Sequence, residues 1–318
     1  MRWRRGLWLA VVLGVLIFAL AGCGPQSDSS AGKTKDQPFA VIIDDLGREV
    51  AMPQKPQRIV VTSASFLEPL HEVGGDVVGR PDSKTVMPDY AKDKPSIGRV
   101  YQIDMEKLLA CKPDLVIINK GMNEKLVEPL EANGIRTIVL SGRSYDQVKH
   151  EIKVLAAVTG EVQKGESIIQ DMDGKITAIR SRIPQDKRRV AVIHSTSNGL
   201  TIQLNTSIAG SAAELLGWEN TAAGLVPFKK DADAAQYSME TLVQENPEVI
   251  FVTSMGNLQE IRGSMEQLFA ENPAWQSVPA VRDHRVYYLS QQYFLLSPGI
   301  HYPEAVEEMA KHVYPEAF

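Results

Sequence analysis

The sequence predicts an α/β protein built as two βαβ lobes joined by one long helix, with a ligand cleft between the lobes. Three observations lead to this prediction: a long amphipathic segment near the middle of the chain, an alternation of short apolar strands and amphipathic helices on both sides of it, and a segment that recurs 134 residues later. Strands that alternate with helices indicate βαβ units and a mainly parallel sheet. Ligands bind such sheets at the carboxyl ends of the strands, so the two lobes are expected to share one cleft.

The long segment runs over residues 161–183. Its apolar residues recur at spacings of three, four and seven, which places them on one stripe of a helix: Val162, Ile168, Ile169, Met172, Ile176, Ile179 and Ile183. Pro184 ends the pattern. At 1.5 Å per residue the helix is about 33 Å long, which is enough to pass from one compact lobe to another.

The repeat pairs residues 102–117 with residues 236–251. The same residue types coincide at Gln102/Gln236, Met105/Met239, Glu106/Glu240, Leu108/Leu242 and Pro113/Pro247. In each copy a capping residue, Asp104 or Ser238, begins a helix, proline follows the helix, and an apolar strand comes next. The two halves of the chain are therefore expected to contain the same supersecondary unit.

The other elements are predicted from apolar β-branched runs and from helical periodicity. We expect a hairpin at 41–48 and a polar hairpin at 197–199, strands at 58–62, 77–79, 115–119, 137–140, 189–194, 249–253 and 286–289, and helices at 66–73, 105–111, 124–133, 145–158, 208–216, 239–244, 258–270 and 303–313.

The first residues are typical of an export signal. Arginines precede an apolar run, and Leu20-Ala21-Gly22-Cys23 resembles the lipobox of bacterial lipoproteins, in which the cysteine is lipidated. The alternative is an uncleaved membrane anchor, but the apolar run of about 15 residues is shorter than the ~20 that a spanning helix needs. We therefore divide the chain into a signal peptide (1–22), a lipidated Cys23 with a flexible tether (23–38), an N-terminal lobe (39–160), an interlobe helix (161–184) and a C-terminal lobe (185–318).

Net charge and cysteine count limit what the protein can bind and how it is stabilised. The net charge of −5 does not favour nucleic acid, which requires a basic face. The chain has two cysteines, so lipidation of Cys23 would leave Cys111 alone and allow no internal disulfide. Cys111 follows an apolar helix, where a small buried side chain is the favoured interpretation and a reactive thiol the alternative.

Several motifs, in this order along the chain, carry a resemblance to a known family. They are Pro95-Ser-Ile-Gly98, Lys112-Pro-Asp-Leu-Val-Ile117, Ala212-Ala-Glu-Leu-Leu-Gly217-Trp-Glu-Asn220 and Val313-Tyr314-Pro315. Over residues 39–318 the chain resembles the substrate-binding lipoproteins of ABC importers for iron complexes, heme and cobalamin. The resemblance implies the class III periplasmic-binding fold, and a protein that captures its cargo outside the cytoplasm, anchored by lipid to the cell membrane.

Within that family the chain looks most like the heme-binding lipoproteins of Gram-positive bacteria, through Val78-Gly79-Arg80-Pro81, Ile97-Gly98-Arg99-Val100-Tyr101 and the segment from Trp275 to Tyr287. Those proteins hold the iron with a methionine of the first lobe and a histidine of the second. Here Tyr101 stands at the methionine position and Met255 at the histidine position. Both side chains can ligate heme iron. The resemblance therefore implies heme as the favoured cargo, with a ferric siderophore or cobalamin as the alternative.

Further ligand contacts are expected around the cleft. An anionic cargo needs cationic partners, for which Arg99 and Lys120 are the first candidates and Lys229 and Lys230 the weaker ones. The resemblance adds His301, in the last loop before the C-terminal helix, although it could equally cap that helix. Tyr293 and Phe294 of the same loop could form an apolar wall.

Glu106 and Glu240 occupy the same position of the repeat. A glutamate in the first turn of a helix is stabilised by the helix dipole and needs no further role. In the family, however, two such acids at the lobe tips pair with arginines of the membrane permease, so the resemblance implies docking onto a permease dimer and its ATPase.

Catalysis is not expected. The sequence contains no nucleophile elbow, no zinc-protease motif and no phosphate loop. His194 and Ser195 are neighbours, but no acid can be placed beside them. An extracytoplasmic hydrolase and a sensory lipoprotein remain the alternatives from other classes. A single stiff interlobe helix also predicts that the lobes close by only a small hinge motion.

Overall fold

A computed structural model describes residues 37–84, 87–196, 199–230 and 232–318. Residues Pro38–Phe318 form one compact unit. The expected signal peptide, Cys23 and most of the tether lie outside the described residues, as do Ser197 and Asn198 of the expected polar hairpin. In the described part of the chain, every helix is too short or too polar to cross a membrane.

A six-stranded sheet, in the order β6-β5-β4-β3-β7-β8, forms the first half of the unit, which we call the N-terminal lobe. Its strands are β3 (Ile59–Val61), β4 (Val77–Asp82), β5 (Ser96–Arg99), β6 (Gln102–Ile103), β7 (Leu115–Asn119) and β8 (Arg136–Leu140). All neighbours are parallel except β5 and β6, which form an antiparallel hairpin. A separate hairpin, β1 (Ala40–Ile43) with β2 (Glu49–Met52), confirms the first predicted turn.

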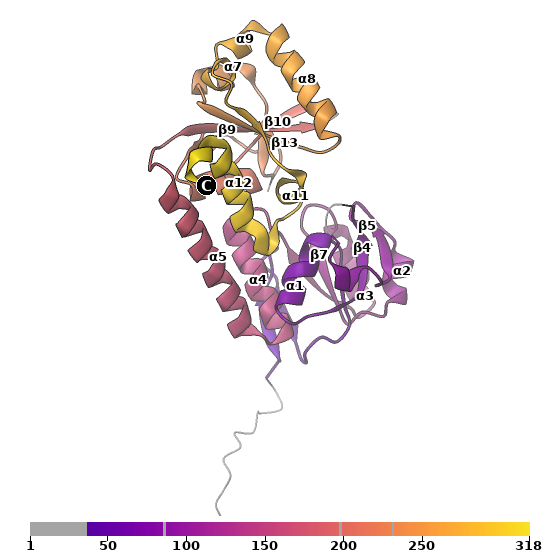
Figure 1. The fold of residues 1–318 in the computed structure, drawn as a ribbon. Helices are drawn as coiled ribbons and strands as arrows, with labels where there is room; N and C mark the ends of the chain where they lie inside the picture. The colour runs from indigo at the N-terminus through magenta and orange to yellow at the C-terminus, as the bar shows by residue number, and fades with distance from the viewer. Residues whose placement is uncertain (1–36, 85–86, 197–198, 231) are drawn as a thin grey trace, which may run out of the picture. The chain divides into compact units, whose positions relative to one another are not determined.

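Short helices connect these strands (Figure 1). They are α1 (Leu67–Glu72), α2 (Met105–Ala110) and α3 (Val127–Ala132), followed by the longer α4 (Tyr145–Thr159). The bounds of α4 follow from its sequence. Ser144 and Gln147 form a capping box at its start, and Gly160, at φ 78°, ends it in a left-handed conformation that glycine adopts without steric cost.

The second sheet, in what we call the C-terminal lobe, has the order β12-β10-β9-β13-β14, with β11 paired to β9. Its strands are β9 (Arg189–Thr196), β10 (Gly199–Gln203), β11 (Glu219–Asn220), β12 (Ala234–Gln236), β13 (Val249–Ser254) and β14 (Val286–Tyr288). The pairs of β9 with β13 and of β13 with β14 are parallel, whereas β10 is antiparallel to β9 and β12. The predicted parallel core is thus confirmed. The antiparallel pairing of β9 with β10 agrees with the hairpin expected at 197–199, whereas the further edge strand β12 was not predicted.

The helices of this lobe are α6 (Ile208–Leu215), α7 (Met239–Glu245), α8 (Leu258–Glu271), α9 (Pro273–Gln276), α10 (Pro279–Arg282), α11 (Gln291–Phe294) and α12 (Tyr302–Val313). The caps of the repeat are confirmed. The Asp104 side chain accepts a hydrogen bond from the backbone N–H of Lys107, and the Ser238 side chain accepts one from that of Thr241. In both copies a short strand, a helix and a buried parallel strand follow one another.

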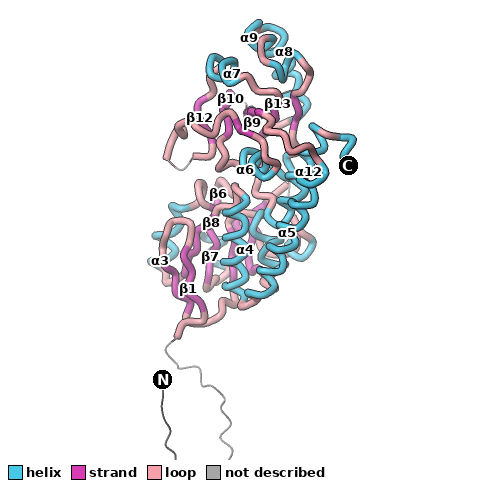
Figure 2. Tube along the Cα trace, turned by 90° about the vertical axis from the view of Figure 1, so that its left-hand side faces the viewer, coloured by secondary structure: helices cyan, strands magenta, loops and turns pink. Residues whose placement is uncertain are grey.

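The long helix α5 (Val162–Arg182) links the two sheets and packs against α4 and α12 (Figures 1 and 2). Ile169, Met172, Ile176 and Ile179 are buried along its predicted stripe, while Val162, its first residue, is 52% exposed. The division into lobes at this helix is our proposal for the domain boundaries.

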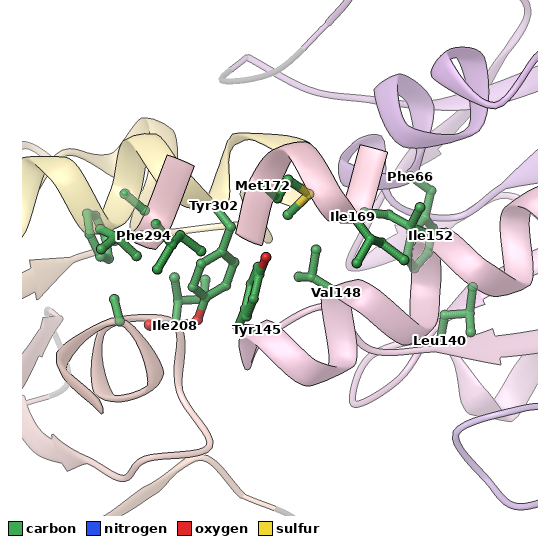
Figure 3. Close-up of a cluster of buried hydrophobic side chains, with 14 of the residues drawn as sticks. Phe66, Leu140, Tyr145, Val148, Ile152, Ile169, Met172, Ile208, Phe294 and Tyr302 are labelled. Carbon is green, nitrogen blue, oxygen red and sulfur yellow. Dashed lines mark hydrogen bonds between the residues drawn. The ribbon is translucent and has the colours of Figure 1, made fainter. Parts of the chain in front are cut away.

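One buried core runs through both halves of the unit. It includes residues that precede α5 and residues that follow it. Figure 3 shows Tyr145 of α4 beside Tyr302 of α12, with Val148, Ile152 and Met172 continuing the same cluster. The rings of Tyr145 and Tyr302 lie 5.1 Å apart, centroid to centroid. The lobes are therefore joined by packed side chains as well as by the interlobe helix.

Candidate ligand-binding site

A cavity of about 820 Å³ lies between the two sheets and is lined from both lobes. Its size falls in the range of about 300–1,000 Å³ that small-molecule sites occupy. The N-terminal lobe contributes Ser63, Asp82, Ser83, Lys84, Arg99, Val100, Tyr101, Asn119, Lys120, Met122, Ser141, Gly142 and Arg143. The C-terminal lobe contributes His194, Thr201, Gln203, Ile208, Phe228, Asp233, Ala234, Met255, Phe294, Leu295, Leu296 and Ser297.

Most of the N-terminal lining residues stand at the carboxyl ends of parallel strands. Asp82 ends β4, Asn119 ends β7, and Ser141 directly follows β8. In the other lobe Met255 directly follows β13. The expectation that ligand-facing residues gather at this end of a sheet therefore describes the N-terminal wall correctly. In the C-terminal lobe it holds for Met255, whereas Thr201 and Gln203 lie within the antiparallel strand β10 and Asp233 directly precedes β12.

Tyr101 and Met255, the two residues favoured for contact with iron, line this same cavity from opposite lobes. Tyr101 lies at the two-residue tip of the β5–β6 hairpin, where Arg99 pairs with Gln102. Tyr101 is 64% exposed and Met255 is 58% exposed, which is unusual for large apolar residues. Arg99 Nη1 donates a 2.6 Å hydrogen bond to the Tyr101 hydroxyl. Both groups are thus open to a ligand.

Cationic side chains line the N-terminal wall. Arg99 and Lys120 were expected there, and the structure adds Lys84 and Arg143. Lys120 Nζ donates to the backbone oxygen of Asp45 at 2.8 Å, and Arg143 Nη1 lies 2.5 Å from Asp233 Oδ2 of the opposite lobe. The wall suits a ligand that carries negative charge.

The remaining predicted contacts lie outside the set of lining residues. His301 Nε2 lies 3.0 Å from Glu68 Oε2, so this histidine bridges η4 (Gly299–His301) to α1. The Tyr293 ring lies 6.5 Å from the ring of His301, centroid to centroid, whereas its neighbour Phe294 does line the cavity. Lys229 and Lys230 are exposed and do not line it, but the adjacent Phe228 does. Ligand contact by His301 and Tyr293 stays a prediction.

His194 is a lining residue that the sequence singled out only as a weak catalytic candidate. Its Nδ1 lies 2.9 Å from the Thr253 hydroxyl, and burial lowers the pKa of its imidazole, which is therefore neutral at pH 7. Ser195, its chain neighbour, is buried and does not line the cavity, because successive residues of a strand point to opposite faces. The sequence signal for His194 was its place near the end of a buried strand.

Two features lie apart from the cavity. Glu106 and Glu240 are exposed in the first turns of α2 and α7. Cys111 is buried at 7% exposure, and burial raises the pKa of its thiol, as expected of a small core side chain.

Within the part of the chain that the structure describes, no cluster of three or more His, Cys, Asp or Glu side chains could hold a metal ion.

Fold and cavity together define a two-lobed ligand-binding protein with the class III periplasmic-binding fold. The family model described as periplasmic binding protein matches residues 59–293, and the chain belongs to this family. It is a substrate-binding protein of the ABC-transporter type.

Named relatives agree with this assignment. The chain is 25% identical to the uncharacterized ABC transporter substrate-binding lipoprotein YvrC of Bacillus subtilis, over 100% of this chain and 99% of that protein. It is 24% identical to the Fe(3+)-citrate-binding protein YfmC of the same organism, over 96% and 97% of the two chains. The crystal structure of IsdE from S. aureus complexed with heme matches with a TM-score of 0.70 at 19% identity, over 81% of this chain and 98% of that one.

Proposed function

We propose that the protein captures an anionic iron complex, with heme as the favoured cargo, and delivers it to an ABC permease without chemical change. The observation that carries this proposal is that Tyr101 and Met255, each more than half exposed, line one cavity from opposite lobes. A phenol and a thioether are both known donors to heme iron. Met122, Phe228 and Phe294 supply apolar surface in the same cavity, as a flat apolar ring requires.

A ferric carboxylate or siderophore complex is the second candidate. The row of cations on the N-terminal wall favours it, because Lys84, Arg99, Lys120 and Arg143 would neutralise several ligand oxygens. The relative named as a ferric-citrate-binding protein supports this candidate, and the structural neighbour complexed with heme supports the first. Cobalamin is less well supported, because its one anionic phosphate would leave most of the four lining cations without a partner.

Delivery requires that this protein dock onto a permease dimer, which works together with its ATPase. We assign Glu106 and Glu240 to the docking surface of this protein. Both acids are exposed, and both stand at the second position of a helix that the repeat duplicates. Neither forms a side-chain hydrogen bond or an ion pair among the described residues, so each carboxylate is available to a partner. Two acids at equivalent points of two lobes suit a symmetric partner.

The protein would work at the outer face of the cell membrane, held by lipid on Cys23. The lipobox and the relatives that are named lipoproteins support this location. The packed core between α4, α5 and α12 supports a small closing motion, because opening the lobes widely would expose Tyr145, Met172 and Tyr302.

A titration of the detergent-solubilised full chain tests the cargo. Heme is followed by its Soret absorbance, and ferric citrate by quenching of tryptophan fluorescence, since Trp218 and Trp275 both lie in the C-terminal lobe. Saturable one-to-one binding of heme supports the first candidate, and binding of ferric citrate without heme supports the second. Binding of neither complex would overturn the proposed cargo class.

A further inference from the structure

An ion pair crosses the cavity. Arg143 lies in the loop between β8 and α4 of the N-terminal lobe, and Asp233 lies directly before β12 of the C-terminal lobe. Arg143 Nη1 and Asp233 Oδ2 are 2.5 Å apart, and both residues line the cavity. The ion pair therefore lies at the cavity in which a ligand would bind.

The charges around this pair are unevenly distributed. All four lysines and arginines that line the described cavity belong to the N-terminal lobe, whereas Asp233 is the one lining residue of the described C-terminal wall that carries a charge at neutral pH. Asp82, the second lining acid, is engaged 2.5 Å away by Arg80, which is not a lining residue. Asp233 is thus the acid of the described cavity that neutralises one of its lining cations.

The pair is not needed to hold the lobes together. The Tyr302 hydroxyl bonds to the backbone oxygens of Arg143 at 3.2 Å and Ile208 at 3.0 Å. The backbone N–H of Tyr145 donates to Ser211 Oγ at 3.1 Å, and the buried core continues past both contacts. These contacts fix the Arg143 backbone and join the lobes without any contribution from its guanidinium.

Breaking the ion pair costs little free energy. The side chains of Arg143 and Asp233 are 39% and 25% exposed, and pairs this open to solvent contribute about 0–1 kcal/mol. A ligand carboxylate can take both guanidinium nitrogens at once, which makes it a stronger partner than a single oxygen contact. Asp233 would then be left as a negative charge close to a bound anion, which opposes binding.

We propose that Asp233 is an internal competitor for the cargo: in the empty cleft it occupies the Arg143 guanidinium that a carboxylate of the bound complex takes. This inference rests on the proposed anionic cargo and deepens it. Asp233 therefore makes binding depend on the charge of the complex, because a complex without an anionic group cannot displace Asp233 from Arg143. The cleft therefore selects iron complexes that carry carboxylates over neutral ones of similar size.

Two substitutions at this pair have opposite expected effects. Asp233→Asn keeps the shape, removes the competing charge and tightens binding of heme or ferric citrate, whichever the wild type binds, by about threefold to tenfold. Arg143→Gln removes the cation and weakens binding tenfold or more. In the Arg143→Gln background, Asp233→Asn loses most of its effect, and raising the salt concentration reduces the gain.

Asp283→Asn is the matched control, because this aspartate of the C-terminal lobe is paired with Arg282 and Arg285 and does not line the cavity. It is expected to change affinity less than twofold. Weaker or unchanged binding by Asp233→Asn, in a protein whose wild type binds and whose melting temperature is unaltered, overturns the inference while leaving the cargo class intact. Failure of the wild type to bind either complex overturns the proposed function, and this inference with it.

Discussion

Lys112 and Asn246 adopt the same left-handed backbone conformation, with φ 49° in both, at equivalent positions of the two repeats. Each directly precedes the proline that follows its helix, Pro113 or Pro247. The contacts around them also correspond. The backbone N–H of Arg58, which precedes the central strand β3, donates to Asp114. The backbone N–H of Arg189, which begins the central strand β9, donates to Glu248. The repeat found in the sequence is therefore a repeat of backbone geometry.

Lys112→Gly is expected to raise the free energy of unfolding by about 0.5–1 kcal/mol, because glycine adopts positive φ without the steric cost that a Cβ brings. The hydrogen bond that Arg58 Nε makes to the Lys112 backbone oxygen is retained. Asn246→Gly should change little, since asparagine tolerates this conformation. Urea denaturation measures both. Lys112→Ala is the control and should not stabilise; an equal gain from alanine would show that backbone strain is not the cause.

Glu151 on α4 is fully buried, and neither of its carboxyl oxygens has a hydrogen-bond partner among the described residues. Burial, together with the nearby charge of Asp45, raises the pKa of Glu151 to about 8 from 4.5. The folded chain therefore keeps a proton that the unfolded chain releases, so stability should fall as pH rises from about 4.5 to about 8 and should then level off.

Glu151→Gln is expected to remove that pH dependence and to stabilise the protein at pH 8 by about 4 kcal/mol relative to wild type, with a much smaller difference at pH 4.5. Guanidinium denaturation across this pH range is the measurement. Glu128→Gln, at an exposed glutamate of α3, is the control and should leave the profile unchanged. A wild-type profile that is flat between pH 4.5 and 8 would contradict the buried, protonated state of Glu151.

Tyr101→Phe and Met255→Ala are expected to alter the Soret band of the heme complex and to weaken heme binding by about tenfold each, because each removes one donor to the iron. Tyr293→Phe, at a tyrosine outside the lining set, is the matched control. Absorbance titration gives both the spectrum and the affinity. Wild-type spectra from both variants would exclude these side chains as iron ligands, even if heme still binds in the cleft.

The double substitution Glu106→Lys and Glu240→Lys should reduce cargo uptake by cells about tenfold while leaving binding by the purified protein unchanged, because it reverses the charge of both proposed docking points. Each single variant is expected to have a smaller effect. The double substitution Glu128→Lys and Glu166→Lys, at exposed acids of α3 and α5, controls for the same change in net charge. Full uptake by the double variant would rule out permease docking through these acids.

The sequence located most of the parallel strands and the longer helices correctly, because local signals determine them. The strand at 115–119 and the helix start at Tyr145 are found as predicted, since a β-branched run defines the first and a Ser144–Gln147 capping box the second. The short strands β6, β11 and β12 were not predicted. Two or three residues carry too little periodicity, and pairing with a neighbouring strand is what stabilises them.

The candidate site also contains residues that the sequence could identify and residues that it could not. Tyr101, Met255, Arg99 and Lys120 could be named from strand ends and from the family resemblance, and all four line the cavity. Arg143, Asp233 and Phe228 could not be named, because no local pattern separates them from solvated loop residues. His301 contacts Glu68, a residue far away in the sequence, which no local pattern indicates, and its contact with the ligand stays a prediction.

The sequence by itself determined that two similar α/β halves flank a long helix, because periodicity, caps and the repeat are all local properties of the chain. Only the tertiary structure decided which side chains meet across the cleft. Arg143 and Asp233 come together because β8 ends and β12 begins at the same cavity, from different lobes, and Tyr302 holds Arg143 there through its backbone. Contacts between residues so distant in the chain depend on how two finished sheets pack, which no local pattern encodes.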